Sequence, residues 1–172
     1  MDNQLDVPLD ILKLPVPLKE GYDRRLKLIE LIEKPLWTIT GKCAKDTLIP
    51  DLVSICKVNG QYQFIIFDAK YYNAKLEKGI VPTGQPGIES VTKQYLYQLS
   101  YQKFIEEHNF SAVKNCFLLP TENNKIEDKG EVRMEMLSNL GLQDIKTRLV
   151  PATMAYDLYL SGRKMDIESL DL

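Results

Sequence analysis

Two apolar segments joined by Asn59-Gly60 restrict the fold of this chain more than any other feature of its sequence. The first, residues 48–58, is rich in Leu, Ile and Val, and the second, residues 61–72, is rich in Tyr, Phe and Ile. Asn-Gly between two such segments is the strongest short-range signal for a β-hairpin, because both positions of the tight turn favour positive φ. The sequence therefore predicts two adjacent antiparallel strands.

Helical and strand-like patterns alternate through the rest of the chain. The prolines among residues 1–19 predict an extended arm. Residues 20–34 have apolar positions at helical spacing and end before Pro35, which predicts a helix. The remaining elements that we expect are a glycine- and proline-rich loop over 73–87, a helix over 88–107, a strand over 112–119, a charged loop over 122–130, strands over 132–137 and 145–150, and a last helix that starts with Pro151, runs to Leu160 and is ended by Gly162.

This order of elements predicts an α/β domain with a central mixed β-sheet flanked by helices. A chain of 172 residues has the size of one domain. No apolar run approaches the roughly 18–20 residues of a membrane span, and the first residues have no secretory signal pattern. The three cysteines are odd in number and widely spaced, which is typical of reduced thiols in a cytoplasmic protein.

The charge of the chain restricts how it could act on nucleic acid. Its formal net charge is −2, so it does not have the overall positive charge of a stand-alone nucleic-acid-binding module. If it acts on DNA, its affinity must come from a local basic strip, from bound metal or from a partner subunit. The single histidine, His108, excludes chemistry that needs two or more histidines.

Three ionisable residues lie at the ends of the predicted hairpin that are far from its turn. Asp51 starts the first strand and Asp68 ends the second, so the pairing places them nearly opposite each other, with Cβ atoms roughly 5 Å apart. Lys70 follows Asp68 by two residues, so both side chains leave the same face of the strand. Two carboxylates and one ammonium are therefore expected to converge.

Such a group has the composition of a metal-dependent hydrolytic site. Two carboxylates can bind a hard cation such as Mg²⁺, which takes oxygen ligands and keeps several waters. A lysine beside them can orient an attacking water and stabilise charge on a phosphate. The alternative is a solvated Asp68–Lys70 pair at a strand end, with Asp51 simply following a proline bend.

Longer strings around these residues resemble known nucleases. Pro50-Asp51 followed by Asp68-Ala69-Lys70 resembles the PD-(D/E)xK nuclease superfamily. The wider sequence is similar to the nuclease subunit of LlaJI-type restriction endonucleases. The strings that carry this similarity are Lys34-Pro-Leu-Trp37, Thr47-Leu-Ile-Pro-Asp51, Ile65-Ile-Phe-Asp-Ala-Lys-Tyr-Tyr72, Gly84-Gln-Pro-Gly-Ile88, Lys93-Gln-Tyr-Leu-Tyr-Gln-Leu-Ser-Tyr101 and Asn115-Cys-Phe-Leu-Leu-Pro-Thr121.

The resemblance implies that residues 20–172 form a nuclease domain with a restriction-endonuclease-like core. It implies an endonuclease that depends on Mg²⁺, for which Mn²⁺ could substitute, and that hydrolyses phosphodiester bonds of double-stranded DNA. Asp51, Asp68 and the Ala69 carbonyl would bind the metal, and Lys70 would position the water. The implied partner is an AAA+ GTPase resembling McrB, and a homodimer is left open.

Two other functions remain open at this stage. One is a different nuclease on the same core, such as a RecB-like exonuclease or a junction resolvase. The other is a non-catalytic subunit that keeps the fold and docks onto the GTPase. Retention of Asp51, Asp68 and Lys70 favours catalysis over docking alone.

The helix predicted over 88–107 carries further candidates. Gln94, Gln98, Tyr101 and Ile105 fall on one stripe of that helix, and glutamines are unusual on a face that should contact the sheet. The arrangement is similar to the Gln-and-Tyr helix of RecB-like nucleases, although Gln98 and Tyr101 are one residue closer than in that pattern. We predict that Gln98 supports Lys70, whereas Gln94 fits either a functional or a half-exposed position.

Nucleases of the superfamily commonly take another metal-binding glutamate from a helix before the hairpin. The nearby candidates are Glu20, Glu30 and Glu33, each of which also fits a solvated helix position. Residues 21–33 are more similar to the segment that follows this helix in LlaJI-type proteins. The expectation is then that the acidic helix lies upstream of Met1.

Overall fold

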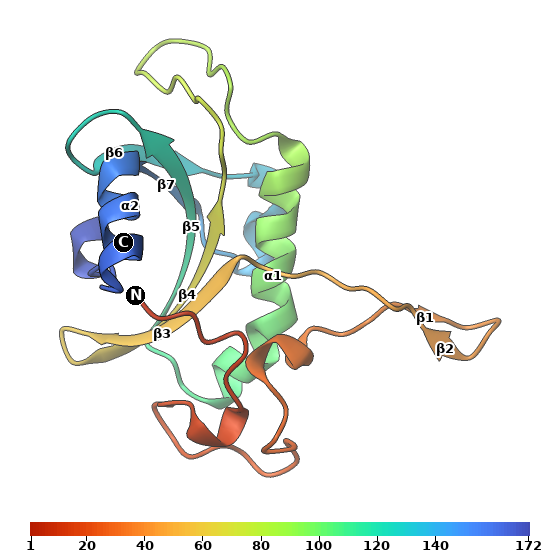
Figure 1. The fold of residues 1–172 in the computed structure, drawn as a ribbon. Coiled ribbons are helices and arrows are strands. Elements are labelled where there is room, and N and C mark those ends of the chain that lie inside the picture. The colour runs from red at the N-terminus through yellow and green to blue at the C-terminus, as the bar shows by residue number, and fades with distance from the viewer.

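A five-stranded mixed sheet organises the chain in the computed structural model, which describes residues 1–172 (Figure 1). Its strand order is β3-β4-β5-β7-β6. The inner pairs β4–β5 and β5–β7 are parallel, and the outer pairs β3–β4 and β6–β7 are antiparallel. The predicted α/β class is confirmed. The strands are β3 (Leu52–Val58), β4 (Gln61–Ala69), β5 (Ala112–Thr121), β6 (Glu127–Val132) and β7 (Ile145–Pro151).

The hairpin predicted from Asn59-Gly60 is confirmed. Asn59 has φ 49° and Gly60 has φ 83°, so both residues have the positive φ that this turn needs. The register runs without interruption from Val58 opposite Gln61 to Leu52 opposite Phe67. The next residues outward from that last pair are the two aspartates of the predicted site.

Helix α1 (Ile88–Glu107) connects the parallel strands β4 and β5 and covers one face of the sheet (Figure 1). Its range is the predicted one. Phe64 and Ile66 of β4 point to this face and pack with Tyr101 and Phe104 of α1. Because side chains alternate along a strand, Asp68 also leaves the sheet on the α1 face.

The opposite face is covered by the C-terminal part of the chain. Ile65 and Phe67 pack there with Leu170 of a short 3₁₀ turn, and helix α2 (Ala152–Ser161) lies on the same side (Figure 1). Gly162 ends α2 in the left-handed conformation, as predicted. The start of α2 differs from the predicted one by a single position. Pro151 is the last residue of β7 and the N-cap of α2, so the helix begins at Ala152.

The predicted helix over 20–34 is wrong. The segment holds only the 3₁₀ turn Leu28–Leu31, because its backbone bonds to the first residues of the chain instead of to itself. Leu28 N–H donates to the Val7 carbonyl (3.1 Å), and Ile29 N–H donates to the Leu5 carbonyl (2.9 Å). These long-range bonds also fold the expected extended arm back onto the domain.

The N-terminal segment contributes to the core and covers the edge of the sheet. Leu5, Leu9 and Leu12 are buried against the α1 face, and Leu9 begins the 3₁₀ turn Leu9–Ile11. Asn3 and Gln4 lie along β3, the edge strand that leads from the site. Gln4 N–H donates to the Val53 carbonyl (2.8 Å), and the Gln4 side chain bonds both the N–H and the carbonyl of Ile55.

Two regions differ from the expected loops and strands. The charged segment expected as a loop over 122–130 begins β6 at Glu127, and the expected strand over 132–137 gives way to the 3₁₀ turn Glu135–Leu140. β6 is a polar edge strand, whose pattern does not differ from that of a loop. The sequence also did not predict the small hairpin of β1 (Leu36–Trp37) and β2 (Lys42–Cys43).

None of the helices combines the length and apolar character needed to cross a membrane. Cys43, Cys56 and Cys116 are all free thiols, as expected. Cys116 is buried in the sheet, whereas Cys43 is exposed on the small hairpin.

Candidate active site

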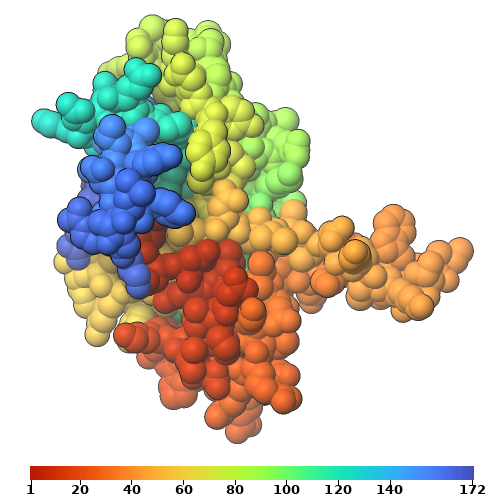
Figure 2. Space-filling view, viewed as in Figure 1, coloured from red at the N-terminus to blue at the C-terminus, as the bar shows by residue number.

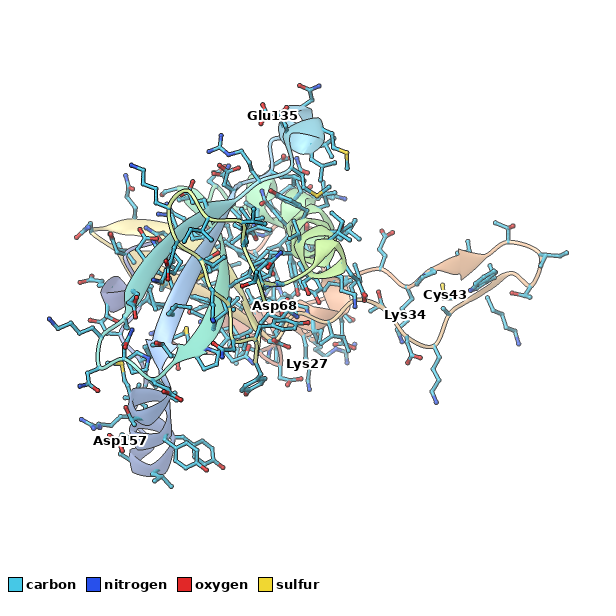
Figure 3. The ribbon with its side chains drawn as sticks, turned by 90° about the horizontal axis from the view of Figure 1, so that it is seen from above. Lys27, Lys34, Cys43, Asp68, Glu135 and Asp157 are labelled. Atoms are coloured by element: carbon cyan, nitrogen blue, oxygen red, sulfur yellow. The ribbon has the colours of Figure 1, made fainter.

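Asp51 and Asp68 meet at the end of the β3–β4 hairpin that is far from its turn. They follow directly on the Leu52–Phe67 pair, as the predicted register requires. The Ala69 N–H donates to Asp51 Oδ2 at 2.8 Å, which fixes the Asp51 carboxylate against the end of β4. In Figure 3, Asp68 lies within the body of the domain, beneath α1 and the loop that follows β4.

Lys70 lies on the same side as Asp68, two residues further along the chain. Its Nζ is 2.7 Å from Asp68 Oδ2, and its backbone N–H donates to the Leu118 carbonyl of β5 at 2.8 Å. The contact with Oδ2 is an ion pair without the geometry of a directed hydrogen bond. Apart from the Lys70 ammonium, no donor of the chain reaches this buried oxygen.

The two carboxylates occupy different environments. Asp68 is 2% exposed, whereas Asp51 faces solvent. The pKa of Asp68 is raised to about 6, first by burial and then by the adjacent Asp51 carboxyl, while the Lys70 ammonium opposes both effects. Asp68 therefore loses its proton at a higher pH than an exposed aspartate, and its charged form still predominates at neutral pH beside the Lys70 ammonium.

This arrangement fits a divalent cation. A buried carboxylate oxygen that only Lys70 contacts, beside a second carboxylate, offers the oxygen ligands that Mg²⁺ prefers. The adjacent Ala69 carbonyl is the further ligand that the sequence comparison implied. No group of three or more His, Cys, Asp or Glu side chains is placed to hold a metal, so these two carboxylates would leave coordination positions for water or phosphate oxygens.

The acidic candidates before the hairpin do not join the site. Glu30 accepts a hydrogen bond from the Lys27 N–H at 2.8 Å and caps its own 3₁₀ turn. Glu20 and Glu33 are exposed. Without the helix expected over 20–34, no regular element carries these side chains toward Asp51.

Tyr97 of α1 belongs to the surroundings of the site, although the sequence did not single it out. Its hydroxyl donates to the Ile49 carbonyl at 3.0 Å and so holds the chain just before Pro50 and Asp51. Burial raises the pKa of Tyr97 to about 12, with smaller contributions from Asp68 and Asp51. The sequence signal that could have identified Tyr97 is its spacing of four residues from Lys93, which places both side chains on the same side of the helix.

Lys93 lies on the exposed side of the same helix, next to the site. It pairs with Glu89 at 2.6 Å, which is the first cause of its raised pKa, and Asp68 adds a smaller contribution. The Glu89 carboxylate balances the Lys93 charge, so the pair adds no net positive charge beside the site.

The two glutamines of α1 are buried but bind the sheet rather than Lys70. Gln94 Nε2 donates to the Ile66 carbonyl (2.9 Å) and to Asn115 Oδ1 (3.2 Å). Gln98 Oε1 accepts hydrogen bonds from Asn115 Nδ2 (2.6 Å) and from the Gln143 N–H (3.0 Å). The prediction that Gln98 supports Lys70 is therefore not matched by its contacts, because Asn115 lies opposite Ile66, before the strand reaches Asp68.

Replacing Gln98 with methionine is expected to lower stability while leaving metal-dependent activity per folded molecule unchanged. The substitution removes the acceptor of Asn115 and Gln143, at a cost of about 2 kcal/mol. For a domain of this size that corresponds to a Tm lower by roughly 4–8 °C. Thermal unfolding and a cleavage assay on the same preparation measure both effects. Loss of cleavage without loss of Tm would restore a role for Gln98 at the site.

Fold and site together define a restriction-endonuclease-like core with two carboxylates and a lysine at the end of its β3–β4 hairpin. The chain belongs to the LlaJI restriction endonuclease family, which it matches over residues 22–156. A curated relative is the Type II restriction enzyme BsuMI component YdjA of Bacillus subtilis (strain 168), 29% identical over 148 residues. The alignment covers 83% of this chain and 30% of that relative, so the chain spans about a third of its length. No solved structure matches the chain.

Proposed function

We propose that this chain is the DNA-cleaving core of a restriction enzyme, a Mg²⁺-dependent endonuclease of the PD-(D/E)xK type. The observation that carries the proposal is the convergence of Asp51, Asp68 and Lys70 at one end of the β3–β4 hairpin. Membership of the LlaJI family and similarity to a restriction enzyme component support a role in a restriction system. Double-stranded DNA is the proposed substrate.

Each residue of the site has a distinct task in this proposal. Asp51 and Asp68 bind Mg²⁺ or Mn²⁺ together with the Ala69 carbonyl. The bound cation supplies Lewis acidity toward the phosphate and makes water a better nucleophile. Lys70 orients the attacking water and stabilises negative charge on the phosphate. Tyr97 keeps Asp51 in register by holding the Ile49 carbonyl.

One observation favours a second function, that of a non-catalytic interaction subunit. The site has two carboxylates, and no third acidic side chain of this chain joins them to complete a metal-binding cluster. The named relative is a component of its enzyme, which agrees with action beside other subunits. The endonuclease proposal also includes a cytoplasmic location, a GTPase partner resembling McrB and an arrangement as a homodimer.

A plasmid assay separates these functions. Supercoiled DNA is incubated with the chain and Mg²⁺, Mn²⁺ or EDTA, with and without the products of neighbouring restriction genes. The endonuclease proposal expects metal-dependent nicked and linear products. Degradation of linear DNA with closed circles spared indicates an exonuclease. Intact plasmid under every condition, together with no Mn²⁺ binding by calorimetry, indicates the non-catalytic subunit.

Metal-free stability is expected to depend on the ionisation of Asp68. Its folded pKa of about 6 lies above its ordinary value of 3.8, so the protonated form favours folding below pH 3.8 and this contribution is lost as the pH rises through 6. In EDTA at pH 7.5, Asp68→Asn is therefore expected to be more stable than the wild type, by roughly 1–3 kcal/mol. At pH 4 the two proteins should differ little.

Denaturant unfolding of both proteins at the two pH values measures this difference. The matched control is Asp157→Asn, which changes an exposed carboxylate on α2. Adding Mg²⁺ at pH 7.5 should stabilise the wild type and the control but not Asp68→Asn, because ligand binding to the folded state alone raises stability. A wild-type deficit that is equal at pH 4 and pH 7.5 would contradict the assigned environment of Asp68.

A further inference from the structure

The small hairpin of β1 and β2 stands away from the rest of the molecule (Figures 1 and 2). We call residues 34–45 the basic hairpin. Leu36 pairs with Cys43 and Trp37 with Lys42, and every residue from 33 to 43 is exposed. At about 3.3 Å per residue, its outer end is roughly 20 Å from Glu33 at the base. None of its residues belongs to the hydrophobic core.

The basic hairpin is nevertheless an ordered element. The Ala44 N–H donates to the Pro35 carbonyl (2.6 Å), and the Thr40 hydroxyl donates to the Trp37 carbonyl (2.9 Å). At its base the Thr47 hydroxyl donates to the Glu33 carbonyl (2.6 Å). These bonds shape the element but attach it to nothing else.

Its surface combines apolar and positive side chains. Trp37 is 64% exposed, and Ile39 is 96% exposed. Lys34, Lys42 and Lys45 are the only charged residues between positions 34 and 45. Since the whole chain carries −2, removing these three positive charges leaves −5 for the rest. The element that projects thus has a net positive charge, whereas the exposed Glu33 and Asp46 flank it at its base.

We propose that the basic hairpin binds duplex DNA, with its lysines on the phosphates and Trp37 in the groove. A two-stranded β-ribbon has dimensions that the major groove admits. Trp37 lies opposite Lys42 in the register, so an aromatic ring and an ammonium are presented together. Charge complementarity favours DNA over a neutral protein surface, and the fit of a β-ribbon to the major groove favours DNA over an acidic one.

The basic hairpin is connected to the candidate active site by a short segment of chain. Thr47 at the hairpin base is four residues before Asp51, a reach of roughly 14 Å for extended chain. Figure 3 shows Lys34 and Cys43 on the projecting element and Asp68 in the body from which it extends. A duplex held by the basic hairpin would therefore lie near the carboxylates. This inference rests on the proposed action on DNA, but it concerns binding and not cleavage.

The test measures binding in EDTA, where cleavage plays no part. A fluorescein-labelled duplex of about 30 base pairs, roughly three helical turns, is titrated between about 50 and 200 mM salt. The variant Lys34→Ala/Lys42→Ala/Lys45→Ala is compared with the control Lys13→Ala/Lys19→Ala/Lys103→Ala, which changes three exposed lysines elsewhere. Trp37 is the only tryptophan of the chain, so its emission reports on the hairpin directly.

We expect the hairpin variant to bind at least about tenfold more weakly at low salt, with a salt dependence reduced by roughly 2–3 in logarithmic slope. The control should bind like the wild type, and DNA should change Trp37 emission in both. Both variants should keep the wild-type Tm. Equal binding by the two variants, unchanged Trp37 emission at saturating DNA, or no binding by the wild type would each overturn the proposal. Because the titration is metal-free, failure of cleavage leaves its outcome unaffected.

Discussion

Replacing Asp68 with asparagine is expected to lower the rate of metal-dependent DNA cleavage by at least about 10³-fold. The substitution keeps the shape of the side chain but removes the charge that binds the cation. Metal-assisted stabilisation of the transition state amounts to several kcal/mol, and each 1.36 kcal/mol corresponds to a factor of ten in rate. Initial rates of plasmid nicking at saturating Mn²⁺ measure the effect.

The design separates a chemical defect from a folding defect. Burial disfavours the charged carboxylate in the metal-free protein, so Asp68→Asn is expected to fold at least as well as the wild type. Asp157→Asn serves as the control for loss of one negative charge. Cleavage by Asp68→Asn within tenfold of the control rate would remove Asp68 from the proposed mechanism.

The second large effect is expected at Lys70. Lys70→Met should lower kcat by about 10²–10³-fold, in the range measured for positioned acid–base groups, with a much smaller change in KM. Lys70 Nζ lies 2.7 Å from Asp68 Oδ2, so in the proposed mechanism it acts on the reacting groups. It would contribute little to the binding of the rest of the duplex, which is what KM mainly reports. Single-turnover rates across DNA concentrations give the two constants separately.

Two further measurements distinguish positioning from charge alone. Lys70→Arg keeps the positive charge but changes the donor geometry, so partial activity would indicate an electrostatic role. The Lys70 ammonium lowers the pKa of Asp68, so Lys70→Met should also move the pH dependence of metal-free stability to higher pH. An unchanged kcat in Lys70→Met would be incompatible with the assigned role.

The hairpin and the placement of the two aspartates were predictable because their determinants are local. The turn type follows from Asn59-Gly60, and the register then follows from counting outward to Leu52 and Phe67. Helix α1 was also predictable over its full length from local sequence, because a glycine-rich loop marks its start and a strand-like segment follows its end.

Features that depend on distant partners were not predictable in the same way. Residues 20–34 have helical periodicity, but their N–H groups bond to the carbonyls of Leu5 and Val7, which no local pattern reveals. Gln98 was expected at Lys70 because the helix was considered without its neighbours. Asn115 on β5, which is its actual partner, becomes adjacent only when the sheet forms.

The residues that precede β3 also determine how larger molecules can approach the sheet. An uncovered outer strand can recruit a strand from another molecule and so lead to aggregation. Here the polar backbone groups of Val53 and Ile55 are already occupied by Asn3 and Gln4. Self-association through this sheet edge is therefore disfavoured. The exposed surface beside Asp51 can still bind a ligand such as a duplex, because that ligand does not pair with the strand backbone.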